Sequence, residues 1–139
     1  GAEGYPQTEA IFNAELDRLA EKYSLPRESI QALWTLQGTY LEEILDSLPE
    51  FSPELIRGTS LPRQYVAWTI EHEWAETLGD LVERRLMLIF SETLKEETLD
   101  DLAECLVAAG KVLPEQAPDL IQSYKMHLDQ FYGKAVVTT

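Results

Sequence analysis

The sequence predicts an all-α protein, a compact bundle of about six or seven short helices. Apolar residues recur at helical spacing over nearly the whole chain, and no stretch shows the strict apolar–polar alternation of a half-buried strand. The 139 residues are the usual size of one domain, and 45% of them are apolar, so a core can form without disulfides. We therefore expect a single helical domain over residues 1–139.

The first two helices are predicted from apolar spacing and from residues that suit helix ends. The hydroxyl of Thr8 can cap a helix that continues to Tyr23, with Ile11 among the residues of its apolar side. Pro26 suits the first turn of a second helix, because proline lacks the N–H that has no partner there. Gly38 ends this helix.

The middle of the chain predicts two short helical pieces and one longer helix. Thr39 is expected to cap a helix that ends before Pro49, and a single helical turn is expected within residues 52–58. Leu61-Pro62 begins a longer helix whose apolar side includes Trp74, turned inward.

Residues 77–80, directly after this helix, have the pattern of a helix cap and predict that another helix begins there. Thr77 can accept a hydrogen bond from the backbone N–H of Asp80, while the Asp80 carboxylate reaches back, as in a shortened capping box. The helix that starts there is expected to continue through Phe90.

Two helices are predicted in the last third of the chain. Thr98 is expected to cap one that ends at Gly110, and Pro114 or Pro118 to begin another that ends at Gly133.

Composition excludes several classes of partner. Eleven basic residues against 25 acidic ones give a net charge of −14, which would repel nucleic acid and anionic lipid alike. No apolar run reaches the roughly 20 residues that cross a bilayer, so direct membrane insertion is not expected. The single cysteine, Cys105, is expected to be a buried apolar residue in a reducing, cytoplasmic compartment.

The two ends of the chain carry expectations of their own. The start GAEGYPQTEA lacks Met, a basic stretch and an apolar signal core, so residue 1 is expected to be a cut end. The closing AVVTT is expected to be frayed.

The sequence does not match the residue patterns of the common metal-binding and catalytic motifs. A zinc peptidase needs His-Glu-x-x-His, and the sequence from His72 places Glu76 where the second histidine belongs. His127 has no companion ligand, and the residues three before the two histidines are Thr69 and Tyr124, so the Glu-x-x-His pattern of di-iron bundles fails too. Dinucleotide, phosphate-loop and nucleophile-elbow motifs are also lacking. No catalytic, cofactor-binding or metal residue is therefore assigned.

Charges of both signs gather around one predicted helix corner, and two interpretations stay open. The structural or interdomain candidates are His72, Glu73, Trp74, Asp80, Arg84 and Arg85. In the first interpretation Glu73 or Asp80 pairs with an arginine and fixes the helix crossing, with Trp74 packed beneath. In the second, part of this cluster faces a partner domain.

This corner resembles the C-terminal helical domain of FAD-dependent, quinone-linked glycerol-3-phosphate dehydrogenases and of the related glycerophosphate oxidases. Residues 61–90 are similar to that domain's helix with His-Glu-Trp/Met-Ala followed by Thr-Leu-x-Asp-x-x-x-Arg-Arg-Thr. The matching positions are His72, Glu73, Trp74, Ala75, Thr77, Leu78, Asp80, Arg84 and Arg85. Residues 33–45 are similar to the family's Tyr-Gly-Thr segment, with Gln37 replacing the tyrosine. Leu86 and Tyr65 depart from the family's threonine and frequent glutamate.

The resemblance implies a parent flavoenzyme that oxidises sn-glycerol 3-phosphate to dihydroxyacetone phosphate and passes electrons from FAD to a quinone or another acceptor. It also implies that the flavin and substrate sites belong to a larger N-terminal domain. These 139 residues are then expected to bind no cofactor and to stabilise, order or oligomerise that FAD domain. Asp80, Arg84 and Arg85 would buttress the corner that meets it. The parent would be cytoplasmic or peripheral on the cytoplasmic membrane.

A second interpretation comes from a different class of protein. The chain can also be a free-standing acidic interaction module, whose exposed apolar groove receives a partner helix.

Overall fold

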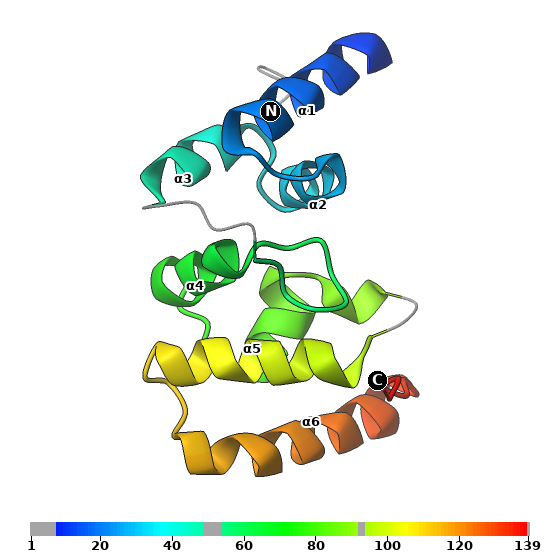
Figure 1. Cartoon of the computed structure of the whole chain (residues 1–139). Coiled ribbons are helices and arrows are strands. Elements are labelled where there is room, and N and C mark those ends of the chain that lie inside the picture. The colour runs from blue at the N-terminus through cyan, green and yellow to red at the C-terminus, as the bar shows by residue number, and fades with distance from the viewer. Residues whose placement is uncertain (1–7, 49–53, 92–93, 139) are drawn as a thin grey trace. The chain divides into compact units, whose positions relative to one another are not determined.

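The computed structural model describes residues 8–48, 54–91 and 94–138, and the regular elements in these ranges are all helical. The predicted all-α class is therefore confirmed (Figure 1). The elements are α1 (Glu9–Tyr23), α2 (Arg27–Gln37), η1 (Gly38–Tyr40), α3 (Leu41–Ser47), α4 (Arg63–His72), η2 (Asp80–Arg85), η3 (Leu88–Phe90), α5 (Glu96–Ala108), η4 (Pro114–Gln116) and α6 (Ala117–Tyr132).

The chain, predicted as one domain, divides by its contacts into two compact units. Unit 1 comprises Gly1–Leu55 and Ser60–Tyr65, and unit 2 comprises Ile56–Thr59 and Val66–Thr139. Helix α4 begins in unit 1 and continues in unit 2. None of the helices in the described ranges has the length and apolarity needed to cross a membrane.

Helix α1 of unit 1 begins as predicted. The Thr8 hydroxyl accepts a hydrogen bond from the Ile11 amide at 3.2 Å. Leu16 and Leu19 are buried on the inner side of the helix. Ile11, expected on the apolar side, is 55% exposed, because it lies in the first turn, before the stretch that holds the buried leucines.

Helix α2 ends at Gly38 as predicted, but the predicted cap of α3 is wrong. Thr39 lies inside the 3₁₀ turn η1, and Tyr40 occupies the cap position without a side-chain hydrogen bond. The first turn of α3 is held to α1 by ion pairs. Glu42 contacts Arg18 at 2.9 Å and Lys22 at 2.8 Å. Pro49, the expected end signal, lies outside the described residues.

The helical turn predicted within residues 52–58 is also wrong where the structure describes it. Leu55 forms an isolated antiparallel bridge with Pro62, so this part of the chain is extended. Gly58 then turns with φ +79°, and a Cβ there would lie 2.5 Å from the Thr98 hydroxyl. Residues 52–53 lie outside the described ranges.

Helices α5 and α6 of unit 2 run antiparallel and pack side by side (Figure 1). Leu102 and Leu106 of α5 and Leu128 of α6 are buried, and Cys105 is buried as predicted. Helix α6 ends at Gly133 with φ +60°, again as predicted.

The start of α5 differs from the prediction. Thr98 does not cap this helix: it lies inside the first turn, and its hydroxyl donates to the Arg57 carbonyl at 2.7 Å. One turn later, the buried Asp101 carboxylate accepts from the Arg57 backbone N–H at 2.8 Å and from its guanidinium at 2.8 and 3.0 Å. These bonds fix the 56–59 segment on α5.

The expectation of a frayed tail is wrong for residues 135–138. Val137 donates its N–H to the Leu94 carbonyl and accepts the Glu96 N–H, both at 2.8 Å. The segment before α5 is extended and offers these backbone groups, which gives the tail a partner.

Candidate functional site

The corner that carries the sequence candidates begins where α4 ends. The Glu73 amide makes a last helical hydrogen bond to the Thr69 carbonyl at 2.9 Å. The His72 ring stacks on Trp68 with 5.1 Å between centroids, and its Nδ1 lies 3.1 Å from the Trp68 carbonyl oxygen. His72 therefore closes the last turn of α4 and lies on its surface.

Trp74 does not pack beneath the corner, contrary to the expectation. Its backbone is left-handed with φ +59°, and 81% of the residue is exposed. The left-handed turn after α4 points Trp74 outward, and Ala75 takes the buried position instead. A left-handed conformation is uncommon for a bulky residue and marks a constrained turn.

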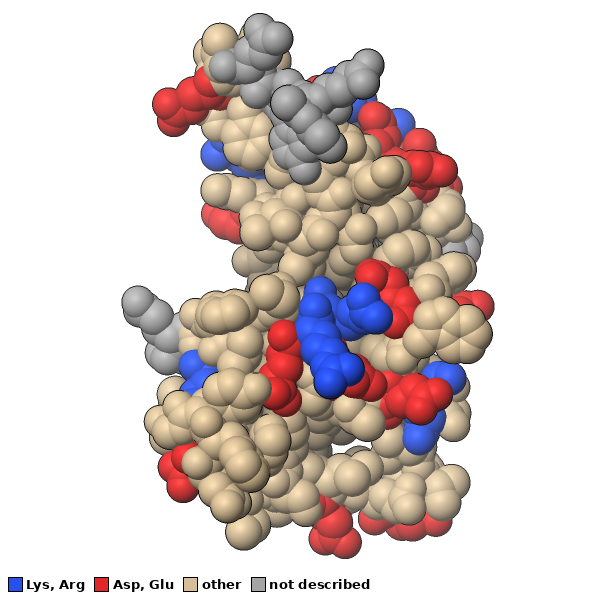
Figure 2. All heavy atoms as spheres, turned by 180° about the vertical axis from the view of Figure 1, so that it is seen from behind, with Lys and Arg blue, Asp and Glu red and all other residues tan. Residues whose placement is uncertain are grey.

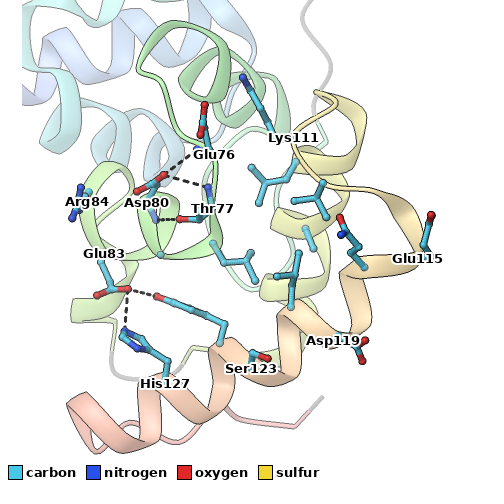
Figure 3. Close-up of a pocket in the computed structure, with 18 residues that line it drawn as sticks. Glu76, Thr77, Asp80, Glu83, Arg84, Lys111, Glu115, Asp119, Ser123 and His127 are labelled. Carbon is cyan, nitrogen blue, oxygen red and sulfur yellow. Dashed lines mark hydrogen bonds and ion pairs between the residues drawn. The ribbon is translucent and has the colours of Figure 1, made fainter.

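Thr77 and Asp80 form the reciprocal cap that the sequence predicts (Figure 3). The Asp80 amide donates to the Thr77 hydroxyl at 3.0 Å, and the Asp80 carboxylate accepts from the amides of Glu76 at 3.0 Å and Thr77 at 3.3 Å. The pKa of Asp80 lies below its usual value. The main cause is the hydrogen bond from the Glu76 amide, which outweighs the opposing effect of burial. Asp80 therefore holds the turn as an ionised group.

The helix after this cap is shorter than predicted, and it is a π-helix. Asp80–Arg85 form the π-helix η2, in which the Leu86 amide donates to the carbonyl of Leu81, five residues earlier, at 2.8 Å. Met87 is left-handed with φ +55° and separates η2 from the 3₁₀ turn η3, so no continuous helix extends to Phe90. π-Helical turns are rare and are often found at functional sites.

The two arginines of the corner have different surroundings. Arg85 pairs with Glu73 at 3.5 Å, which is an ion pair of the kind that the first interpretation of the corner expects. Arg84 is exposed and is one of the lining residues of a pocket. Asp80 binds the backbone, so the arginine pairing at this corner falls to Glu73.

The structure adds a cluster that sequence reasoning missed, centred on Glu83. Its carboxylate accepts hydrogen bonds from the hydroxyls of Tyr124, at 2.9 Å, and Tyr132, and it lies 3.6 Å from His127 Nε2. Burial alone would raise the pKa of Glu83, but the bonds from Tyr132 and Tyr124 and the charge of His127 outweigh it and lower the pKa. The partners lie more than 40 residues away in sequence, so no local spacing indicates them.

A pocket of about 900 Å³ opens between the corner and the α5–α6 hairpin, entirely within unit 2 (Figure 3). Its apolar lining comes from Leu78, Ala103, Leu106, Val112 and Leu120. Its charged lining comes from Glu76, Asp80, Glu83, Arg84, Lys111, Glu115 and Asp119, with His127 beside Glu83. The pocket therefore joins an apolar floor to a mainly acidic edge.

Within the described ranges, no three His, Cys, Asp or Glu side chains lie together in a way that could hold a metal ion. The pocket's carboxylates serve other partners or face solvent. A comparison of the chain with known proteins matches no protein-family model, no curated protein and no solved structure.

Proposed function

We propose that the chain is the non-catalytic, C-terminal helical domain of an FAD-dependent glycerol-3-phosphate dehydrogenase and that it stabilises or orders the FAD domain. FAD, the substrate site and the route to the electron acceptor belong to the parent enzyme's larger domain. The chain's own residues supply a rigid docking corner.

One observation carries this proposal: four of the residues that resemble the family, Glu73, Thr77, Asp80 and Arg85, contact one another in pairs at the corner. Thr77 and Asp80 cap each other, and Glu73 pairs with Arg85 across the turn. Each of these four side chains makes a contact that depends on its type, which is a physical reason for their places in the pattern. The corner thereby keeps a fixed shape without ligand or metal bonds.

The outward position of Trp74 supports a docking role. A tryptophan that is 81% exposed leaves a large apolar surface in water, and aromatic residues of this kind are common anchors of protein interfaces. Its left-handed backbone holds the ring away from the core. Trp74 and the nearby cap would then meet the FAD domain, while the Glu73–Arg85 pair holds the turn behind them.

The test uses the full-length parent enzyme and compares flavin retention and melting temperature. Trp74→Ser should release FAD more readily and lower the melting temperature of the holoenzyme. Met126→Ser, which removes another exposed apolar side chain of unit 2, serves as the control and should change neither quantity.

Charge reversal tests the supporting pair. Arg85→Glu places two carboxylates together and should lower flavin retention, and the exchange Glu73→Arg with Arg85→Glu should restore part of it. Wild-type flavin retention in both Trp74→Ser and Arg85→Glu would overturn the docking role.

The pocket favours a second candidate function, a free-standing acidic interaction module. A pocket with an apolar floor between α5, α6 and the corner is the groove that this interpretation expects. The coding sequence that precedes residue 1 distinguishes the two candidates. An in-frame G-x-G-x-x-G at a strand-to-helix junction upstream identifies the flavoenzyme, and a start codon directly before residue 1 identifies the module.

A further inference from the structure

The pocket of unit 2 is built to bury apolar side chains. Leu106 and Ala103 of α5 and Leu78 of the corner are buried at its base. Leu120 of α6 lines the same pocket and is 42% exposed, so it offers apolar surface that is accessible to solvent. A volume of about 900 Å³ is large enough for several side chains of a partner.

The edge of this pocket is acidic. Glu76, Asp80, Glu83, Glu115 and Asp119 line it. The lysine and arginine in the lining are Lys111 and Arg84, so the five carboxylates leave the edge with an excess of negative charge. Carboxylates are also spread over the face of the molecule in Figure 2, in keeping with the chain's net charge of −14.

Three of these carboxylates are available to a partner. Glu76, Glu115 and Asp119 form no ion pair with another described residue, and all three are exposed. Asp80 and Glu83 are already engaged by backbone amides and tyrosine hydroxyls. The negative charge of the edge is therefore only partly used inside the chain.

From the apolar floor and the acidic edge we infer that this pocket binds a basic amphipathic helix of a partner protein. Leucine-like side chains of the partner helix enter the floor between Leu78, Leu106 and Leu120, and flanking lysines or arginines meet Glu76, Glu115 and Asp119. An acidic segment or a phosphate-rich ligand would be repelled by the same edge.

The walls favour a helix over an extended peptide. An extended peptide gains affinity by pairing its backbone with an open sheet edge, whereas a helix satisfies its own backbone and inserts side chains. The pocket is walled by α5, α6, the η4 turn and the Thr77–Asp80 corner, and none of its described lining residues belongs to an extended bridge. These walls therefore offer a partner no strand edge to pair with, and a helix that inserts side chains fits them better.

This inference does not depend on the parent flavoenzyme, because it concerns the surface of unit 2 alone. In the parent enzyme the helix would belong to another domain or subunit, and in a free-standing module it would belong to a separate protein. Failure of the Trp74 and Arg85 tests would leave the pocket's binding unaffected, so the two ideas fail separately.

The experiment measures binding of a fluorescein-labelled helical peptide to the 139-residue chain by fluorescence anisotropy. The probe peptide has leucines at i, i+3, i+4 and i+7 and lysines at the flanking positions. A second peptide has glutamate in place of every lysine, and a third has the first peptide's composition in scrambled order. We expect saturable one-to-one binding of the lysine peptide alone.

Two groove variants locate the binding. The triple variant Glu76→Gln, Glu115→Gln and Asp119→Asn should weaken binding about eightfold, roughly twofold for each exposed charge, and added salt should narrow that difference. Leu120→Gln should weaken binding about fivefold through the lost apolar contact.

Matched control variants change the same chemistry outside the groove. The triple Glu28→Gln, Glu43→Gln and Asp129→Asn removes three exposed charges, and Met126→Gln removes an exposed apolar side chain of α6. Both should bind the lysine peptide as the unmodified chain does.

Several results would overturn the inference. These are no saturable binding of the lysine peptide, equal binding of the scrambled or glutamate peptide, or equal losses in groove and control variants.

Discussion

Removal of the Asp80 carboxylate is the perturbation that most directly tests the cap at the corner. Asp80→Ala deletes the acceptor of two backbone N–H groups, those of Glu76 and Thr77. Asp80→Asn keeps one oxygen that can accept but loses the charge. Thr77→Val keeps the shape of Thr77 and deletes the hydroxyl that accepts from the Asp80 amide.

The size of the effect follows from these hydrogen bonds. Loss of a helix N-cap lowers stability by about 0.5–2 kcal/mol, and hydrogen bonds to charged groups contribute about 1.5–3 kcal/mol. Asp80 is partly exposed, so water replaces some of the lost interaction. We expect the free energy of unfolding to fall by about 2 kcal/mol for Asp80→Ala and by about 1 kcal/mol for Asp80→Asn or Thr77→Val.

The pH dependence has a definite sign. The pKa of Asp80 is lower in the folded state than its unfolded value of roughly 3.9, so the folded protein favours the ionised form. The stabilisation is complete above the unfolded pKa and is lost as the pH falls through the folded pKa. The stability gap between wild type and Asp80→Asn should therefore shrink below about pH 4.

Urea unfolding followed by circular dichroism measures these differences. The midpoint should fall while the slope stays constant, because the cap changes stability and leaves the buried surface the same. Midpoints of Asp80→Ala and Thr77→Val that equal the wild-type value would refute the cap. A gap between wild type and Asp80→Asn that widens at low pH would refute the electrostatic argument.

Three further substitutions test the packing and the ion pairs by the same urea assay. Leu128→Ala empties a fully buried position and should lower stability by about 3 kcal/mol; less than 1 kcal/mol would contradict its burial. Asp101→Asn, at a side chain only 2% exposed, weakens the bonds to Arg57 and should lower stability by about 2 kcal/mol, whereas an unchanged midpoint would argue against that contact. Hydrogen bonds from Arg18, then Lys22, lower the pKa of Glu42 to about 2, so Glu42→Gln should lower stability by about 0.5–1 kcal/mol near pH 7. That loss should fade as the pH drops from about 4.5 towards 2, and an equal loss at both ends would contradict the pairing.

Local signals in the sequence predict most of the α-helices and several of their ends correctly. The Thr8 cap, the stops at Gly38 and Gly133 and the Thr77–Asp80 pair all lie within a few residues of the helix that they bound. Their geometry depends on the backbone of one turn, so spacing alone predicts it.

Features that depend on partners far away in the sequence could not be predicted from local spacing. Thr98 has the composition of a cap, but the carbonyl of Arg57, 41 residues earlier, takes its hydroxyl. Val137 looks like a frayed end until the extended segment at Leu94 is placed beside it.

The candidate site also has one part that local sequence signals predict and one part that they do not. The charged corner was found from local spacing, whereas the Glu83 cluster joins η2 to α6 and depends on how these elements pack. Trp74 was misplaced because helical periodicity was extended beyond His72, where α4 ends and the backbone turns left-handed.

The most direct test of the central claim is an anaerobic titration of the full-length protein with sn-glycerol 3-phosphate, followed by the visible absorbance of its flavin. The proposed function predicts that the purified protein carries FAD and that this substrate bleaches the flavin absorbance, while sn-glycerol 1-phosphate leaves it unchanged. A full-length protein without flavin, or one whose flavin stays oxidised at saturating sn-glycerol 3-phosphate, would contradict it.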